Sequence, residues 1–179
     1  AGVGVAEKLC AFVMLIPSAF AQSMTAFVAQ NVGARRMDRA GRALLCGIGL
    51  SLAVSVVVFW GVFFHGDLLS GVFADDGDVI LASAEYLKAY AIDCLLTSFL
   101  FSLIGYFNGC GRTVFTMIQG LTGAFCVRLP VAFLMNRFFH GSLFALGLAT
   151  PCSTVVQILL CGGYFWYLRR KDAARTRES

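Results

Sequence analysis

The stretch Ala29-Gln30-Asn31-Val32-Gly33-Ala34-Arg35-Arg36 ends a long apolar run in a polar turn that contains glycine. A cluster of arginines begins at the end of this stretch and continues through Arg39 and Arg42, with Asp38 as its one acid. Lysine and arginine concentrate in the cytoplasmic loops of membrane proteins. If the flanking apolar runs cross a membrane, this turn is cytoplasmic and orients every segment that follows.

The composition indicates an integral membrane protein. Of the 179 residues, 59% are hydrophobic and 13% are charged, whereas soluble domains carry about 25% charged residues. A soluble domain places charges along the outer face of every helix, but the charges here gather between apolar runs. The net charge of +4 forms no basic patch with interleaved base-stacking aromatic residues, so we expect no nucleic-acid partner.

Five apolar segments reach the length of about 20 residues that a membrane span requires. They lack the alternating pattern of barrel strands, and helices are the other structure that satisfies every backbone group in lipid. The sequence therefore predicts an all-α membrane protein with five transmembrane helices. These cover residues 9–29, 43–64, 86–107, 113–136 and 142–168.

The charges of the connecting segments alternate in sign. The turn at Arg112 is basic, as is the segment 169–179, which we expect to be a disordered cytoplasmic tail. The loop between the fourth and fifth spans carries Arg137 and His140, a mild exception. The acids of the loop between the second and third spans are Asp67, Asp75, Asp76, Asp78 and Glu85. We therefore expect a multi-pass plasma-membrane protein whose first span enters from outside, which implies at least one preceding helix if the complete protein begins in the cytoplasm.

Local chemistry marks helix ends and possible kinks. Asn31 and Gly33 suit the left-handed conformation that terminates a helix. Prolines inside spans each remove a backbone hydrogen bond and allow a kink, and they are Pro17, Pro130 and Pro151.

No catalytic or metal-binding motif is present in the sequence. The seven cysteines include no C-x-x-C pair, so we expect most of them to be small buried hydrophobic residues. The patterns H-E-x-x-H, G-x-S-x-G and G-x-x-x-x-G-K are absent. The sequence therefore predicts neither an enzyme nor a metal site.

Polar side chains form stripes along three of the predicted spans, at about 100° per residue. The third span aligns Tyr86, Tyr90, Asp93, Thr97 and Asn108; the first aligns Glu7, Ser18, Gln22 and Thr25; the fifth aligns Thr150, Thr154 and Gln157. Small residues also allow helices to pack closely. We assign that packing role to Gly47, Ser51, Ser55, Gly105, Gly109, Gly120 and Gly123.

Asp93 and Arg128 differ from these packing residues because a charge at the bilayer centre costs about 2.5–3.5 kcal/mol. One hypothesis is a structural ion pair between the two residues. The other is that Asp93 lines a water-filled cavity, where it binds a cationic substrate or exchanges a coupling proton. Glu7 could face the same cavity, whereas Arg128, two residues before Pro130, is assigned a structural role.

Four short motifs follow one another along the chain, two at turns, one around the acidic loop and one in the fourth span. They are Gln30-Asn31-x-Gly33-Ala34; Phe73, Asp76 and Val79 before Tyr86-Leu87; Asn108-Gly109-x-Gly111-Arg112-Thr113; and Arg128-x-Pro130. In this order they resemble MATE (multidrug and toxic compound extrusion) transporters over nearly the whole chain.

The resemblance implies twelve helices in two lobes, with residues 1–168 forming the C-terminal lobe without its first helix, as helices 8–12. It implies an antiporter that exports small organic cations and drugs in exchange for Na⁺ or H⁺ by alternating access. The lipid bilayer and a missing N-terminal lobe of the same chain would be its partners, and it would use no cofactor beyond the coupling ion.

The resemblance also suggests roles for individual residues. An acid that some members need falls near Thr97 by register, one turn after Asp93 on the same stripe. We list Asp93, Glu7, Thr97, Tyr90 and Gln22 as substrate- or cation-binding candidates. The residues with an expected structural role are Arg128, Pro130, Gln30, Asn31, Gly33, Asn108 and Gly109.

Two alternatives stand beside the antiporter. A lipid-linked oligosaccharide flippase of the same superfamily would handle an anionic pyrophosphate, and should show more inward-facing basic residues than Arg128 alone. A membrane protein that does not transport would bury its polar stripes against one another and would have no shared aqueous cavity.

Overall fold

The computed structural model describes residues 2–72, 77–138 and 143–178, and within these ranges it consists of helices and short turns. Phe73, Asp75, Asp76 and His140 lie outside the described residues. The helices are α1 (Gly2–Val13), α2 (Leu15–Gly33), α3 (Met37–Phe64), α4 (Gly66–Gly71), α5 (Gly77–Gly109), α6 (Thr113–Thr122), the π-helix η1 (Gly123–Arg128), α7 (Leu129–Phe138) and α8 (Leu143–Glu178).

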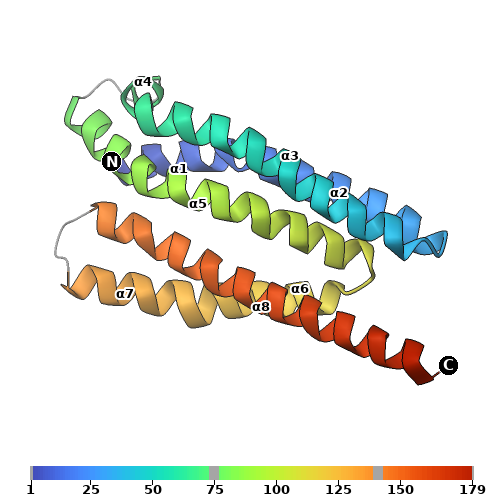
Figure 1. Cartoon of the computed structure of the whole chain (residues 1–179). Coiled ribbons are helices and arrows are strands. Elements are labelled where there is room, and N and C mark those ends of the chain that lie inside the picture. The colour runs from blue at the N-terminus through green and yellow to red at the C-terminus, as the bar shows by residue number, and fades with distance from the viewer. Residues whose placement is uncertain (1, 73–76, 139–142, 179) are drawn as a thin grey trace.

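Helix α5 lies at the centre of the bundle and contacts α1, α2, α3, α4, α6 and α8. Figure 1 shows α1, α2 and α3 on one side of it and α6, α7 and α8 on the other. The α2–α3 turn, the α5–α6 turn and the C-terminus lie at one end, which we call the turn end. The opposite end, which we call the α4 end, holds α4 and the N-terminus. The three basic segments thus share one end, as their charges predict.

Four stretches are long and apolar enough to cross a membrane: Glu7–Gly33, Met37–Phe64, Tyr90–Gly109 and Thr113–Phe138. They correspond to the first four predicted spans. The fifth predicted span corresponds to α8, which is not among these four stretches. Helix α5 has 33 residues, whereas a membrane span requires about 20, so this helix is longer than a span.

Some helices extend beyond the predicted spans: α3 begins at Met37, before the span predicted at residue 43, and α5 begins at Gly77, before the span predicted at residue 86. The prediction of a disordered tail is wrong, because residues 169–178 continue α8. The guanidinium groups of Arg169 and Arg170 lie over the rings of Phe165 and Trp166, one turn earlier, at 5.4 and 3.7 Å from the ring centroids. Such cation–π pairs stabilise the end of the helix.

Pro17 divides the first predicted span into two helices. Proline has no N–H to donate to the carbonyl four residues earlier, and α1 ends at that residue, Val13. Met14 separates α1 from α2. Pro151, in contrast, lies inside α8 without interrupting it.

The turns after α2 and α5 have the same backbone hydrogen bonds. Arg36 N–H donates to Asn31 O (2.9 Å) and Arg35 N–H donates to Val32 O (3.0 Å). At the second turn, Arg112 donates to Phe107 (2.8 Å) and Gly111 to Asn108 (3.0 Å). Both patterns are Schellman motifs, in which the residue after the cap is left-handed.

The left-handed residues of these turns are Arg35 (φ 57°) and Gly111 (φ 76°). The prediction of Asn31 or Gly33 for the first turn is therefore wrong, because both residues still belong to α2. The Asn31 side chain instead donates to the carbonyl of Phe27 at 2.8 Å.

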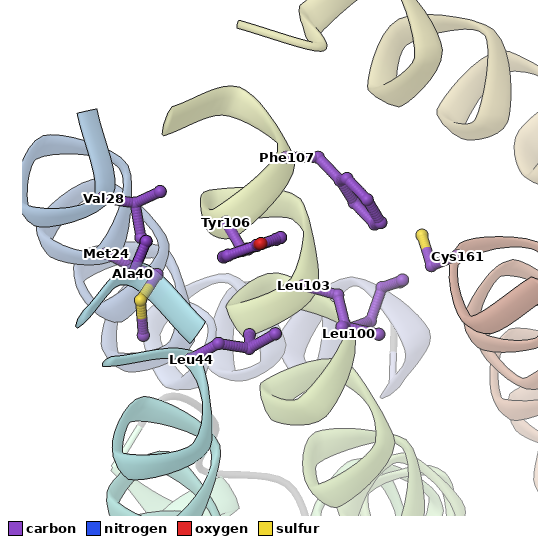
Figure 2. Packing of buried hydrophobic residues seen from close by; sticks show 9 residues of the cluster. All are labelled: Met24, Val28, Ala40, Leu44, Leu100, Leu103, Tyr106, Phe107 and Cys161. Carbon is purple, nitrogen blue, oxygen red and sulfur yellow. The ribbon is translucent and has the colours of Figure 1, made fainter. Parts of the chain in front are cut away.

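The core near the turn end joins α2, α3, α5 and α8 around α5 (Figure 2). Figure 2 shows Phe107 of α5 extending toward Cys161 of α8, with Met24 and Val28 on the opposite side of α5. The Phe107 ring also packs edge-on against Phe115 of α6, with the ring centroids 5.4 Å apart. This core therefore joins both halves of the bundle.

Small residues bring α5 close to α2 and α3, as expected. A Cβ added to Gly105 would lie 2.6 Å from the Ala21 carbonyl, and one added to Gly109 would lie 2.6 Å from Val28 Cβ. Ser51 of α3 hydrogen-bonds to Ser102 of α5 at 3.0 Å, and one turn away Ser55 hydrogen-bonds to Ser98. Gly120 differs from this expectation, because a Cβ there would meet nothing within 4 Å.

The cysteine prediction holds only in part. All seven thiols are free. Cys10, Cys94 and Cys161 are buried and Cys110 is half-buried, but Cys46, Cys126 and Cys152 are exposed. The three exposed cysteines lie on helix faces that no other described helix covers. A thiol is a small apolar group and is tolerated on such a face in contact with lipid.

Candidate functional site: a buried acid between α5 and α8

Asp93 lies on α5 where this helix faces α8, and only 1% of the residue is exposed. Thr154 of α8 places its Oγ1 2.6 Å from Asp93 Oδ1, and its hydroxyl donates to the carboxyl group. The same hydroxyl lies 3.1 Å from the carbonyl of Thr150, so the carboxyl oxygen is the closer acceptor. The hydroxyl of Thr97, one turn along α5, also hydrogen-bonds to Asp93.

Arg128 does not form an ion pair with Asp93 among the residues that the structure describes. It is the last residue of η1 and is exposed, although it lies near enough to interact with the carboxyl group electrostatically. The hydrogen-bonding partners of Asp93 are therefore neutral hydroxyl groups. The direct ion pair is therefore not observed, and a water-filled cavity at Asp93 stays a prediction.

A second polar cluster lies along α8, next to the contact with Asp93. Gln119 of α6 donates through Nε2 to Gln157 Oε1 at 2.7 Å. Gln157 Nε2 lies 3.3 Å from Ser153 Oγ, and Ser153 donates to the carbonyl of Gly123 at 2.9 Å. Gln119 is 2% exposed, and its Oε1 has no hydrogen-bond partner in the described part of the chain. Thr154, Ser153 and Gln157 thus link α8 to both α5 and α6–η1.

The backbone next to this cluster is widened. In η1 the N–H of Leu129 bonds to the carbonyl of Ala124, five residues back, instead of the usual four. Pro130 follows directly, and its ring and missing N–H disfavour regular α-helical bonding in the preceding turn. Gly123 starts the π-helix, and an added Cβ there would lie 2.2 Å from Gln157 Nε2. A glycine at this position lets α8 approach the widened turn.

The other predicted binding residues lie around the acid in different ways. Tyr90 is half-buried, one turn before Asp93, and packs against the cluster of Leu9 and its neighbours. Glu7 and Gln22 are exposed. Buried Cys10 lies within electrostatic range of both Glu7 and Asp93. The structure thus brings Asp93 and Thr97 together with Thr154, and leaves Gln22 on an open helix face.

Sequence reasoning missed the partners of the acid. It placed Thr154 and Gln157 on one face of their helix but gave them no binding role, and it did not single out Gln119 or Ser153. Gln119 and Gly123 are four residues apart and therefore share a helix face. This spacing is visible in the sequence and could have indicated a contact face. Which helix this face meets depends on the tertiary structure.

The remaining predicted structural residues occupy the two turns. Gln30 is exposed and Gly33 has open space around it. Asn108 Oδ1 accepts a hydrogen bond from Thr116 Oγ1 at 2.7 Å, which connects the end of α5 to α6. Across the described residues, no group of three or more His, Cys, Asp or Glu is placed to hold a metal ion.

Comparison with known proteins gives a consistent family. The MatE family model matches residues 1–134. The "Probable multidrug resistance protein YoeA" of Bacillus subtilis (strain 168) is 19% identical over 171 residues, covering 96% of this chain and 37% of the relative. The "Multidrug export protein MepA" of Staphylococcus aureus (strain MSSA476) is 26% identical over 168 residues, covering 89% of this chain and 36% of the relative.

Solved structures agree with this fold. An inward-facing multidrug resistance MATE family transporter of the MOP superfamily superposes with a TM-score of 0.83 at 14% identity, covering 97% of this chain and 40% of that structure. A MATE crystal structure in the bent conformation gives a TM-score of 0.85 at 18% identity, covering 94% and 37%. The chain thus spans about two fifths of the length of the proteins it matches. From the family match, the transmembrane helices and the fold, the chain is a multi-pass membrane protein of the MATE family.

Proposed function

We propose that this chain forms the second lobe of an antiporter that exports organic cations and drugs in exchange for Na⁺ or H⁺, and that Asp93 binds the coupling ion. The observation that carries the proposal is the burial of the Asp93 carboxyl group against two neutral hydroxyl donors, Thr154 and Thr97. Removing a carboxylate from water costs several kcal/mol unless a cation accompanies it. A proton or Na⁺ would remove that cost each time it binds.

The bundle supplies one half of such a machine. Alternating access requires two repeats that move against each other around a central site, so we propose that a first lobe completes the transporter. The basic turn end, with the C-terminus, would face the cytoplasm of the cell and the α4 end would face outside. The relatives named as multidrug resistance and export proteins support drugs as the substrate class.

Efflux in cells tests the role of Asp93. In drug-sensitive cells expressing the full-length transporter, Asp93→Asn should lower the initial rate of ethidium efflux at least about tenfold, a barrier increase of about 1.4 kcal/mol. Asparagine keeps the Oδ1 acceptor for Thr154, so the fold should survive. Asp38→Asn makes the same chemical change at an exposed position in the first turn of α3 and should leave efflux unchanged. Normal efflux by Asp93→Asn at equal protein level would remove this residue from the mechanism.

Proteoliposomes separate ion coupling from substrate binding. If Asp93 binds the coupling ion, the Asp93→Asn variant should lose ethidium uptake driven by a Na⁺ or proton gradient. It should keep ethidium exchange when no gradient is present. Loss of both activities in a folded variant would assign Asp93 to the substrate site instead.

Thr154→Val tests the hydroxyl that contacts the acid. The Thr154 hydroxyl stabilises the ionised carboxylate, and a hydrogen bond to a charged group contributes about 1.5–3 kcal/mol, so its removal should raise the apparent affinity for the coupling ion about tenfold or more. Thr122→Val is the control, because the Thr122 hydroxyl bonds only within its own helix, to Ile118. An unchanged ion dependence in Thr154→Val would show that the α8 contact is structural.

A further inference from the structure

Two consecutive residues of α8 contact two different helices. The hydroxyl of Thr154 donates to Asp93 Oδ1 of α5 at 2.6 Å, and that of Ser153 donates to the carbonyl of Gly123 in η1 at 2.9 Å. Both residues are buried, with 5% and 2% of their surface exposed. Consecutive residues of a helix point about 100° apart and turn together. The contact at Gly123 therefore limits where the Thr154 hydroxyl can lie.

A pair of glutamines anchors the same part of α8, one turn beyond Ser153. Gln119 Nε2 of α6 donates to Gln157 Oε1 at 2.7 Å, and Gln157 Nε2 lies 3.3 Å from Ser153 Oγ. A Cβ on Gly123 would collide with the Gln157 side chain, so this side chain lies directly against the π-helix. Helix α8 is thus held on α6 and η1 by a set of hydrogen bonds that ends beside Thr154.

Stability alone does not explain this pair of amides. Gln119 is 2% exposed, and its Oε1 has no hydrogen-bond partner in the part of the chain that the structure describes. A buried acceptor without a partner costs free energy, whereas apolar side chains of similar shape at both positions can be neutral or stabilising. The two amides instead specify how α8 lies on α6, because their hydrogen bond forms in one relative placement of the helices.

The Thr154 hydroxyl has two acceptors, and the placement of α8 decides between them. Asp93 Oδ1 lies 2.6 Å from the hydroxyl oxygen, and the carbonyl of Thr150, in the same helix, lies 3.1 Å from it. The Thr150 carbonyl moves with Thr154 and stays within reach wherever α8 lies. Asp93 belongs to α5 and stays within reach only while α8 keeps its place. A small shift of α8 would therefore transfer the hydrogen bond from the acid to the helix backbone.

We propose that Gln119 and Gln157 are positioning residues that, with the Ser153–Gly123 contact, hold the Thr154 hydroxyl on the Asp93 carboxyl group. The inference rests on the proposed role of Asp93 as the coupling-ion residue, and it assigns to the α6–α8 contact the task of setting the ion affinity. Because the hydroxyl stabilises the ionised carboxylate, loosening α8 should raise the apparent affinity for the coupling ion.

Replacing both glutamines by methionine tests the positioning role. In proteoliposomes, the full-length transporter with Gln119→Met and Gln157→Met should show an apparent affinity for the coupling ion about threefold higher. The midpoint of thermal unfolding should fall by no more than about 2 °C, because both partners of the hydrogen bond are removed together. Methionine is neutral, so the exchange leaves unchanged the titratable and charged groups within electrostatic range of Asp93, which include Cys10, Cys94 and Arg128.

The Thr154→Val background shows whether the glutamines act through Thr154. There the methionine pair should cause no further change in the apparent ion affinity, because the hydroxyl that the glutamines position is absent. The same threefold change in both backgrounds would overturn the proposal. If Thr154→Val alters the ion dependence and the methionine pair does not, the positioning role is also wrong.

Ser51→Ala is the matched control, because it removes a buried hydrogen bond of 3.0 Å between α3 and α5. It should lower the midpoint of thermal unfolding by about 2–4 °C and leave the apparent ion affinity unchanged. A threefold rise of the ion affinity in Ser51→Ala would mean that any loosened helix contact has this effect, which would overturn the specific role of the glutamines.

Infrared spectroscopy tests the contact without transport, so this proposal and the proposed function can fail separately. In difference spectra of the full-length protein between acidic and alkaline pH, the carboxyl band that Asp93→Asn removes belongs to the acid. A carbonyl group that loses a donated hydrogen bond absorbs at higher frequency, so the methionine pair should shift this band in the same direction as Thr154→Val. A shift with wild-type ion dependence in both variants would keep the positioning role and remove Asp93 from ion coupling. A band shifted by Thr154→Val but not by the methionine pair would overturn the positioning role.

Discussion

The turn after α2 and the turn after α5 share a backbone motif but differ in their surroundings. Each closes its helix with the same pair of hydrogen bonds, from Arg36 and Arg35 in the first and from Arg112 and Gly111 in the second. In this register Gly33 corresponds to Gly109. A Cβ on Gly33 would meet nothing within 4 Å, whereas one on Gly109 would lie 2.6 Å from Val28 Cβ.

This difference shows that a local motif does not define a residue's role. The first turn carries most of the charge and is open, so its residues act on topology and solvation. The second turn ends the central helix, and its glycine is part of the contact between α5 and α2. The same glycine in the same backbone position is therefore dispensable in one turn and required in the other.

The largest contrast should come from the two glycines. Gly109→Leu should destabilise the full-length protein by about 3 kcal/mol, because overpacking a tight contact forces helices apart. Gly33→Leu should change stability by no more than about 0.5 kcal/mol. Thermal unfolding in detergent measures both variants. Equal losses would show that the α2–α5 contact at Gly109 contributes little to stability.

The left-handed positions should respond in opposite directions. A non-glycine residue in this conformation costs about 1–2 kcal/mol, so Gly111→Ala should lower stability by about 1 kcal/mol. Arg35→Gly relieves the same strain and should raise stability. The gain should be only about 0.5 kcal/mol, because glycine loses more conformational entropy on folding, which offsets part of the relief. The same unfolding assay applies. A loss of stability in Arg35→Gly would mean that the arginine side chain compensates for the strain.

The smallest effects should come from the two asparagines. Asn108→Ala removes the hydrogen bond from Thr116, and we expect a loss of about 0.5 kcal/mol because that hydroxyl keeps the Thr113 carbonyl as a second acceptor. Asn31→Ala removes only a bond within α2, with a similar or smaller loss. Adding Thr116→Val should abolish the effect of Asn108→Ala and leave that of Asn31→Ala unchanged. If the losses of stability are purely additive, the hydrogen bond between Asn108 and Thr116 does not stabilise the second turn.

The sequence indicated the part of the candidate site that lies on α5, Asp93 and Thr97, but not the partner of the acid on α8. A carboxyl group in the middle of an apolar run is visible in any sequence, and the face shared by Asp93 and Thr97 follows from the helical repeat. Its contact with Thr154 was not predictable, because 61 residues separate the two side chains. The hypothesis of an ion pair with Arg128 was also wrong. A similar depth in the membrane does not specify toward which neighbouring helix a side chain extends.

The sequence by itself determined the class, the helices and their alternation across a membrane, because apolar run length and loop charge act through the bilayer and need no tertiary contact. It also located the turn at Gln30 to Arg36 and the family motifs. Only the tertiary structure decided that α5 is the central helix, that Arg35 rather than Gly33 is left-handed, and that Asp93 meets Thr154. The central position of α5 and the contact of Asp93 with Thr154 depend on close packing between helices distant along the chain, where one added Cβ or one hydroxyl decides which faces meet. Arg35 is left-handed because α2 continues through Gly33 before it ends.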